Sequence, residues 1–97
     1  MTTYFVSRHP GALEWATAEG IAFDTTLLHL DASLLRAGDT VIGTLPVSAV
    51  AEVYARGGRY LHLAVSVPFD RRGTELTAND LRALGACLRE YRAERVA

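Results

Sequence analysis

Residues 2–15 read TTYFVSRHPGALEW, and the predicted fold depends on these residues more than on any others. The apolar run at residues 4–6 predicts a strand, the polar residues 7–9 predict a tight loop, and Pro10 predicts the first turn of a helix. The first backbone N–H groups of such a helix are unpaired, and the helix dipole places partial positive charge there, so anions are favoured. The stretch therefore predicts a phosphate-handling site at a strand–helix junction.

Two side chains at this junction are suited to phosphate chemistry. Arg8 carries a fixed positive charge, and His9 can take or give a proton near neutral pH. We expect these two residues to be catalytic, and their neighbours in the junction to bind the ligand: Ser7, Pro10 and Gly11. The alternative is that Arg8 and His9 are ordinary surface and capping residues, and the junction alone does not decide between the two.

Composition narrows the possible functions. A chain of 97 residues predicts one domain with a modest core, so we expect a homodimer. The sequence has neither a charged and apolar leader nor an apolar run long enough to span a membrane, so we expect a cytoplasmic protein without membrane contact. The formal net charge of −1 argues against a broad basic surface for long nucleic acid, so any anionic ligand is expected to be small.

Cysteine and lysine usage exclude several chemistries. The one cysteine, Cys87, allows neither a disulfide nor a thiolate metal cluster within one chain. All ten basic residues are arginine, which excludes a P-loop lysine and a Schiff-base mechanism. No carboxylate pair or histidine–carboxylate cluster has convincing metal-ligand spacing, so we expect neither a metal ion nor another cofactor.

The rest of the chain alternates strands and helices. After a first strand at 3–7, the β-branched and aromatic runs predict three more strands, at 23–30, 40–43 and 60–67. Helices are predicted from Pro10 to a stop at Gly20, over 46–56, and from a cap at Thr77 onward, with only a short helical turn between 31 and 38. The last helix is expected to be long, because its apolar stripe runs through Leu81, Leu84, Leu88 and Tyr91.

This alternation predicts an α/β fold, a small Rossmann-like three-layer sandwich with about three helices. Its four strands should be mostly parallel and lie in the order two-one-three-four. In that order the two helix starts meet at the point where the strand order reverses. The connection over 31–39 is short for a crossover, so an antiparallel second strand is the alternative, which would change one sheet edge and leave the site intact.

A second junction, Gly43-Thr44-Leu45-Pro46, repeats the pattern of the first. It places a glycine, a hydroxyl residue and a helix-initiating proline after a short apolar strand, so we expect these four residues to bind the ligand too. Arg71 and Arg72 follow the fourth strand and are either phosphate contacts or a solvated loop. His62, which lies mid-strand among apolar neighbours, is expected to be a core residue rather than a catalyst.

Three stretches carry a resemblance to a known family: YFVSRHPGALEW at 4–15, AGDTVIGTLPVSAVAEVYARGGRYLHLAVSVP at 37–68, and RRGTELT at 71–77. They resemble small CRISPR-associated proteins of type III loci, the family designated Csx-sixteen. The resemblance spans residues 4 to about 88, and the pattern F-V-S-R-H-P-G-A with G-T-L-P is specific. It implies a Rossmann-like protein that recognises cyclic tetra-adenylate, and a ring nuclease that cleaves this messenger and switches off antiviral signalling.

The cleavage that the resemblance implies requires no metal. A ribose 2′-hydroxyl would attack its own adjacent phosphate and leave a 2′,3′-cyclic phosphate, with His9 moving the proton and Arg8 stabilising the charge. Ser7 and Thr44 would orient the phosphate or ribose, and Trp15 or Tyr4 would stack on an adenine, although the helical spacing of Trp15 favours a core or dimer contact. Two alternatives remain, a non-catalytic protein that sequesters the messenger and a structural accessory of a CRISPR complex.

Overall fold

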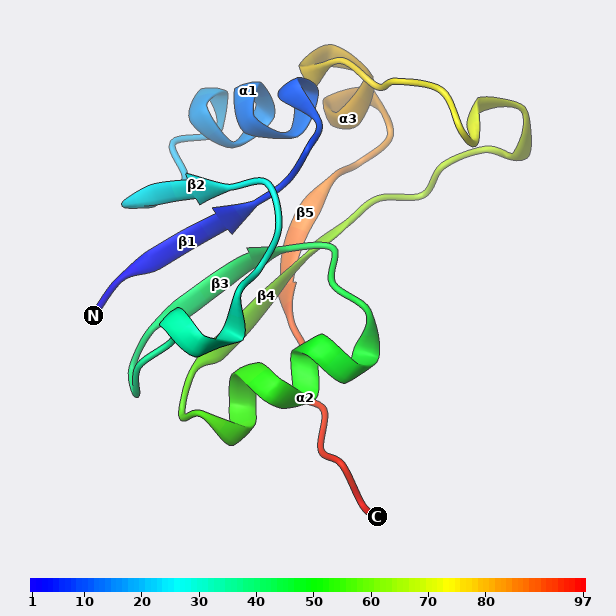
Figure 1. The fold of residues 1–97 in the computed structure, drawn as a ribbon. Helices are drawn as coiled ribbons and strands as arrows, with labels where there is room; N and C mark the ends of the chain where they lie inside the picture. Colours follow the sequence, from blue (N-terminus) through cyan, green and yellow to red (C-terminus); the bar gives the residue numbers. More distant parts are fainter.

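Five strands form a single sheet in the computed structural model, which describes residues 1–97 (Figure 1). The strands are β1 (Thr3–Val6), β2 (Thr25–Leu27), β3 (Thr40–Gly43), β4 (Arg59–Ala64) and β5 (Cys87–Glu90). They lie in the order β2-β1-β3-β4-β5, with β1 to β4 parallel and β5 antiparallel to β4. The predicted order of the first four strands is confirmed, and β2 is parallel despite its short connection to β3.

Helices cover both faces of the sheet, as the sandwich prediction requires. The helices are α1 (Pro10–Ala18), α2 (Val47–Ala55) and α3 (Ala78–Ala83), and two short 3₁₀ turns are η1 (Ala32–Leu34) and η2 (Phe69–Arg71). Helices α1 and α3 lie on one face and α2 lies on the other (Figure 1). None of these helices has the length and apolar character of a membrane-spanning segment.

Strand β1 shows why the sheet needs both layers. Phe5 is buried in the core cluster that α1 and α3 share, whereas Val6 is buried in the cluster beneath α2. Successive side chains of a strand point to opposite faces, so an apolar run is stable only where both faces are covered. Burying a side chain such as Phe5 contributes about 1.5–3 kcal/mol, and this fixes the strand that carries the first junction.

The predicted long final helix is wrong, and the sheet has a fifth strand in its place. Helix α3 ends at Ala83, and Gly85 adopts a φ of 76°, a left-handed conformation that stops a helix. The chain then turns into β5, where Leu88 pairs with Leu63 of β4 and packs against the core of the α1 face. The pairing satisfies backbone groups along β4 that would otherwise form an open sheet edge, so tertiary structure overrides the helical spacing.

Asp39 fixes the start of β3 beside β1. Its carboxylate is buried and accepts hydrogen bonds from the backbone N–H groups of Arg36, at 2.9 Å, and of Thr2, at 2.8 Å. These two donors hold the pKa of Asp39 below its usual value, because they favour the charged carboxylate. The carboxylate thus ties the chain before β1 to the turn before β3 and sets the register that brings the two junctions together.

Candidate functional site

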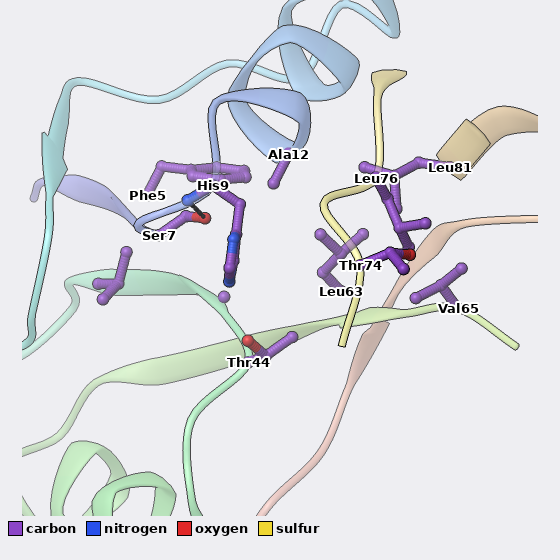
Figure 2. Close-up of a pocket in the computed structure, with 12 residues that line it drawn as sticks. Phe5, Ser7, His9, Ala12, Thr44, Leu63, Val65, Thr74, Leu76 and Leu81 are labelled. Carbon is purple, nitrogen blue, oxygen red and sulfur yellow. Dashed lines mark hydrogen bonds between the residues drawn. The ribbon is translucent and has the colours of Figure 1, made fainter. Parts of the chain in front are cut away.

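A cavity of about 160 Å³ lies where β1, β3 and β4 end. Its lining is mostly apolar and comes from the sheet, from α1 and α3, and from the segment before α3: Phe5, Val6, Ala12, Leu63, Val65, Leu76 and Leu81. Four polar side chains and one glycine complete it: Ser7, His9, Thr44, Thr74 and Gly43. The two predicted junctions therefore meet at one cavity at the carboxyl ends of the parallel strands (Figure 2).

The first junction holds His9 at the edge of this cavity. His9 is the residue that precedes α1, with an extended backbone (φ −104°, ψ 114°), and its side chain makes no capping hydrogen bond. Its backbone N–H donates to Ser7 Oγ at 3.1 Å, and Pro10 begins the helix. The imidazole is therefore free to project from the helix start, and Figure 2 shows it extending toward Thr44.

Glu75 contacts the imidazole from a distant part of the chain. His9 Nδ1 lies 3.1 Å from Glu75 Oε1 and 3.3 Å from Oε2, although the two residues are 66 positions apart. Both side chains are 62% exposed, so the pair lies in solvent contact at the mouth of the cavity. Glu75 was not among the residues predicted from the sequence, but it shares with Arg71 and Arg72 a position beyond the carboxyl end of β4.

The hydroxyl of Tyr60 organises the second junction. Tyr60 Oη donates to the Gly43 carbonyl at 2.9 Å and accepts from the Leu45 N–H at 2.9 Å. His62 Nδ1 lies 2.7 Å from the same oxygen, so with the hydroxyl proton donated to Gly43 this contact is a hydrogen bond when Nδ1 carries a proton. Burial raises the pKa of Tyr60, so the hydroxyl keeps the proton that Gly43 accepts.

Loss of this hydroxyl should destabilise the junction. We expect Tyr60→Phe to lower the free energy of unfolding by about 1–3 kcal/mol, since the Gly43 carbonyl and the Leu45 N–H lose their partner in a partly or fully buried place. Urea unfolding followed by circular dichroism measures the change. Tyr4→Phe is the matched control, because the structure gives the Tyr4 hydroxyl no hydrogen bond; an equal loss in both variants would contradict the role of Tyr60.

Gly43 itself is required by the packing of two parallel strands. A Cβ at this position would lie 2.6 Å from the Val6 carbonyl oxygen, closer than Cβ atoms approach backbone in proteins. Strand β3 can therefore lie this close to β1 only with glycine at its end. The consequence is a narrow gap between the first and second junctions, so Ser7 and Thr44 line the same cavity.

The structure does not bring all the predicted site residues into the cavity. Ser7, His9, Gly43 and Thr44 line it, whereas the others at the two junctions do not: Arg8, Pro10, Gly11, Leu45 and Pro46. Arg8 is exposed and forms no ion pair within the chain, and Gly11 is buried against the segment before α3.

Trp15 lies away from the cavity, in the core. It is 2% exposed and packs in the cluster of the α1 face, which is the core position that its helical spacing favours. In this structure its ring has no face open to a ligand, so the proposed stacking on an adenine has no support.

The two arginines after β4 lie beside the cavity rather than in it. Arg71 Nη2 lies 3.0 Å from Asp80 Oδ2, and Asp80 is also part of the capping box that begins α3. Arg71 and Arg72 line a second hollow of about 400 Å³ that shares Val65, Thr74 and Leu76 with the cavity. The two hollows are therefore neighbours that share these three lining residues. The arginines of the second hollow place positive charge beside the cavity.

Comparison with known families decides the identity of the chain. Residues 4–94 match the sequence model of a family described as "Putative CRISPR-associated protein (Cas_VVA1548)". The chain belongs to this family. No curated protein matches this CRISPR-associated chain, and no solved structure matches it. The matched range includes both junctions, Tyr60 and Glu75, so every residue of the cavity and its supports lies within the family region.

The side chains at the cavity determine the chemistry available to this CRISPR-associated protein. No group of three His, Cys, Asp or Glu side chains is placed to hold a metal ion. What the cavity edge does offer is a proton-transfer group, His9, together with the hydroxyls of Ser7 and Thr44. These groups can bind a phosphate ester and move a proton at it.

Proposed function

We propose that this CRISPR-associated protein binds cyclic tetra-adenylate and cleaves it as a metal-independent ring nuclease of type III systems, which switches off antiviral signalling. One observation carries the proposal: an imidazole, that of His9, lines a cavity formed by two strand–helix junctions. The resemblance of both junctions to the Csx-sixteen family supplies the ligand. Cytoplasmic CRISPR signalling is the setting that this ligand implies.

The size of the cavity favours a ligand that enters only in part. A cavity of about 150 Å³ is known to hold one benzene ring, so a volume of about 160 Å³ suits one ring of a nucleotide and not a whole cyclic messenger. One base or ribose would enter the apolar interior, and the neighbouring phosphate would stay at the polar side chains. The hollow lined by Arg71 and Arg72 lies beside it and would receive a further phosphate.

The reaction follows from the groups at the cavity edge. The ribose 2′-hydroxyl attacks the adjacent phosphorus and gives its proton to His9. The P–O5′ bond breaks, and the protonated His9 returns that proton, through solvent, to the leaving 5′ oxygen. The products are a 2′,3′-cyclic phosphate and a 5′-hydroxyl, and no water or redox partner is consumed. Ser7 and Thr44 bind the phosphate oxygens. Arg8 is exposed between Ser7 and His9 and forms no ion pair within the chain, so its side chain would have to turn toward the phosphate to offset the charge that develops there.

A homodimer suits this ligand. A ring of four equal nucleotides has two-fold symmetry, and a two-fold dimer would present the same cavity to opposite phosphates. Each protomer would then hold one part of the ring, in keeping with the small volume of a single cavity.

Incubation with radiolabelled cyclic tetra-adenylate, with and without a chelator, tests the proposal. We expect linear products that end in a 2′,3′-cyclic phosphate and a 5′-hydroxyl, at the same rate in both conditions. Binding without product would instead establish a non-catalytic protein that sequesters the messenger. If neither binding nor product is observed, the result would favour a structural accessory of a CRISPR complex.

A further inference from the structure

Glu75 approaches His9 from the segment between η2 and α3. The side chains of its neighbours Thr74 and Leu76 line the cavity opposite Ser7 and His9 (Figure 2). We propose that Glu75 is a positioning residue that fixes the tautomer of His9 and leaves Nε2 as the nitrogen that takes a proton from the ligand. The effect on catalysis rests on the ring-nuclease function proposed above, whereas the effect on the imidazole does not.

The contact itself defines which ring nitrogen carries the proton. Both carboxylate oxygens of Glu75 lie within 3.3 Å of the same atom, His9 Nδ1. An ionised carboxylate only accepts hydrogen bonds, so Nδ1 must be the donor. In a neutral imidazole one nitrogen donates and the other accepts, so Nε2 is left unprotonated. That is the form of the ring that can act as a base at Nε2.

The backbone that carries Glu75 is held in place at both of its sides. The Leu76 carbonyl oxygen lies so close to Gly11 that no Cβ fits there, which anchors the segment on the first turn of α1. Thr77 follows directly and begins α3 through a capping box with Asp80. On the other side, Thr74 Oγ1 donates to the Arg71 carbonyl at 2.6 Å. The carboxylate is therefore presented to His9 by a fixed segment rather than by a free loop.

A role in stability alone does not explain this pair. Both side chains are 62% exposed, and ion pairs this open to solvent contribute little to folding. The pair acts instead on the orientation and the protonation pattern of a ring that lines the cavity. Carboxylates that accept from the far nitrogen of an imidazole serve this purpose in catalytic triads, where they set the tautomer and do not take up the proton.

Two readouts on the same variants test the proposal. We expect ¹⁵N NMR of the parent at pH 8 to show His9 as the Nδ1–H tautomer, and Glu75→Ala to shift it toward Nε2–H, the form that dominates in free imidazole side chains. We expect kcat for cyclic tetra-adenylate to fall about 10²-fold in Glu75→Ala, the lower end of what a positioned acid–base group contributes, with KM unchanged. Glu75→Gln keeps an acceptor oxygen and should restore both the tautomer and most of kcat.

The control and the contrary results distinguish the positioning role of Glu75 from the proposed ring-nuclease function. Glu14→Ala removes another exposed acidic side chain, one without an ion pair, and should leave the His9 resonances and kcat as in the parent. A parent His9 in the Nε2–H form, or the same tautomer in parent and Glu75→Ala, would overturn the role of Glu75 even if the messenger is cleaved. The expected tautomer shift in a protein that cleaves nothing would uphold that role and refute the ring-nuclease function.

Discussion

Replacement of His9 by alanine is expected to lower kcat for cleavage of cyclic tetra-adenylate by about 10²- to 10⁴-fold, the contribution of a positioned acid–base group. The reason is that His9 is the one titratable side chain in the lining of the cavity, so no neighbour can take over proton transfer there. Binding should change little, because Ser7, Thr44 and the backbone of the first junction remain. The loss should therefore fall on kcat, with Kd close to that of the parent.

Single-turnover cleavage of radiolabelled messenger measures the rate, and gel shift measures binding. The side chain of His9 is 62% exposed, so its removal should leave the urea midpoint unchanged and any loss of activity is a loss of chemistry. His29→Ala is the matched control, since His29 is an exposed histidine outside the cavity lining. Cleavage by His9→Ala at the parent rate would remove His9 from the mechanism.

The fold could be predicted from the sequence wherever the residues of a short segment are enough to fix its backbone conformation and to show which of its faces must be buried. The apolar run of β1 requires cover on both faces, and Phe5 and Val6 are indeed buried on opposite sides of the sheet. The prolines at the starts of α1 and α2 and the glycine at the end of α1 mark boundaries that depend only on local backbone geometry. Parallel strands with intervening helices then leave few topologies, so the order of the first four strands could be deduced.

The fifth strand could not be predicted, because its stability comes from a distant partner. Leu84, Leu88 and Tyr91 have the spacing of a helical stripe, and a pattern of this kind does not show that the edge of β4 is open. In the structure, Leu88 lies opposite Leu63 and Cys87 lies opposite Ala64. Gly85 was the local sign of a break, since a glycine in a helical pattern is also a common place for a helix to end.

Part of the candidate site could likewise be predicted from the sequence, and part could not. The convergence of Ser7, His9, Gly43 and Thr44 was predictable, since strand order places the carboxyl ends of β1 and β3 side by side. The contacts that hold these residues were not, because Tyr60 and Glu75 reach them by side-chain geometry. Residue pattern gives the edge of the sheet on which a residue lies, but not which atom it contacts.

Gly11→Ala is expected to destabilise the protein, although helix propensity alone predicts the opposite. Alanine is favoured over glycine inside a helix by about 1 kcal/mol. A Cβ at Gly11, however, would overlap the Leu76 carbonyl oxygen, and that atom belongs to the backbone, so it cannot turn aside as a side chain does. Overpacking of this kind costs about 1–3 kcal/mol or more, so we expect a net loss, at about 4–8 °C in Tm for each kcal/mol.

The same substitution should also disconnect Glu75 from His9, because the segment that presents Glu75 is anchored at Gly11 through Leu76. Thermal unfolding measures the stability, and the ¹⁵N signals of His9 measure the contact, which we expect to shift toward the Nε2–H tautomer as in Glu75→Ala. Gly20→Asn is the control at the other end of α1: its φ of 71° suits asparagine and no atom lies within 4 Å of an added Cβ, so both measurements should match the parent. A Gly11→Ala protein as stable as the parent, with the His9 tautomer retained, would mean that the close approach of Leu76 neither limits residue 11 nor holds the proposed base in position.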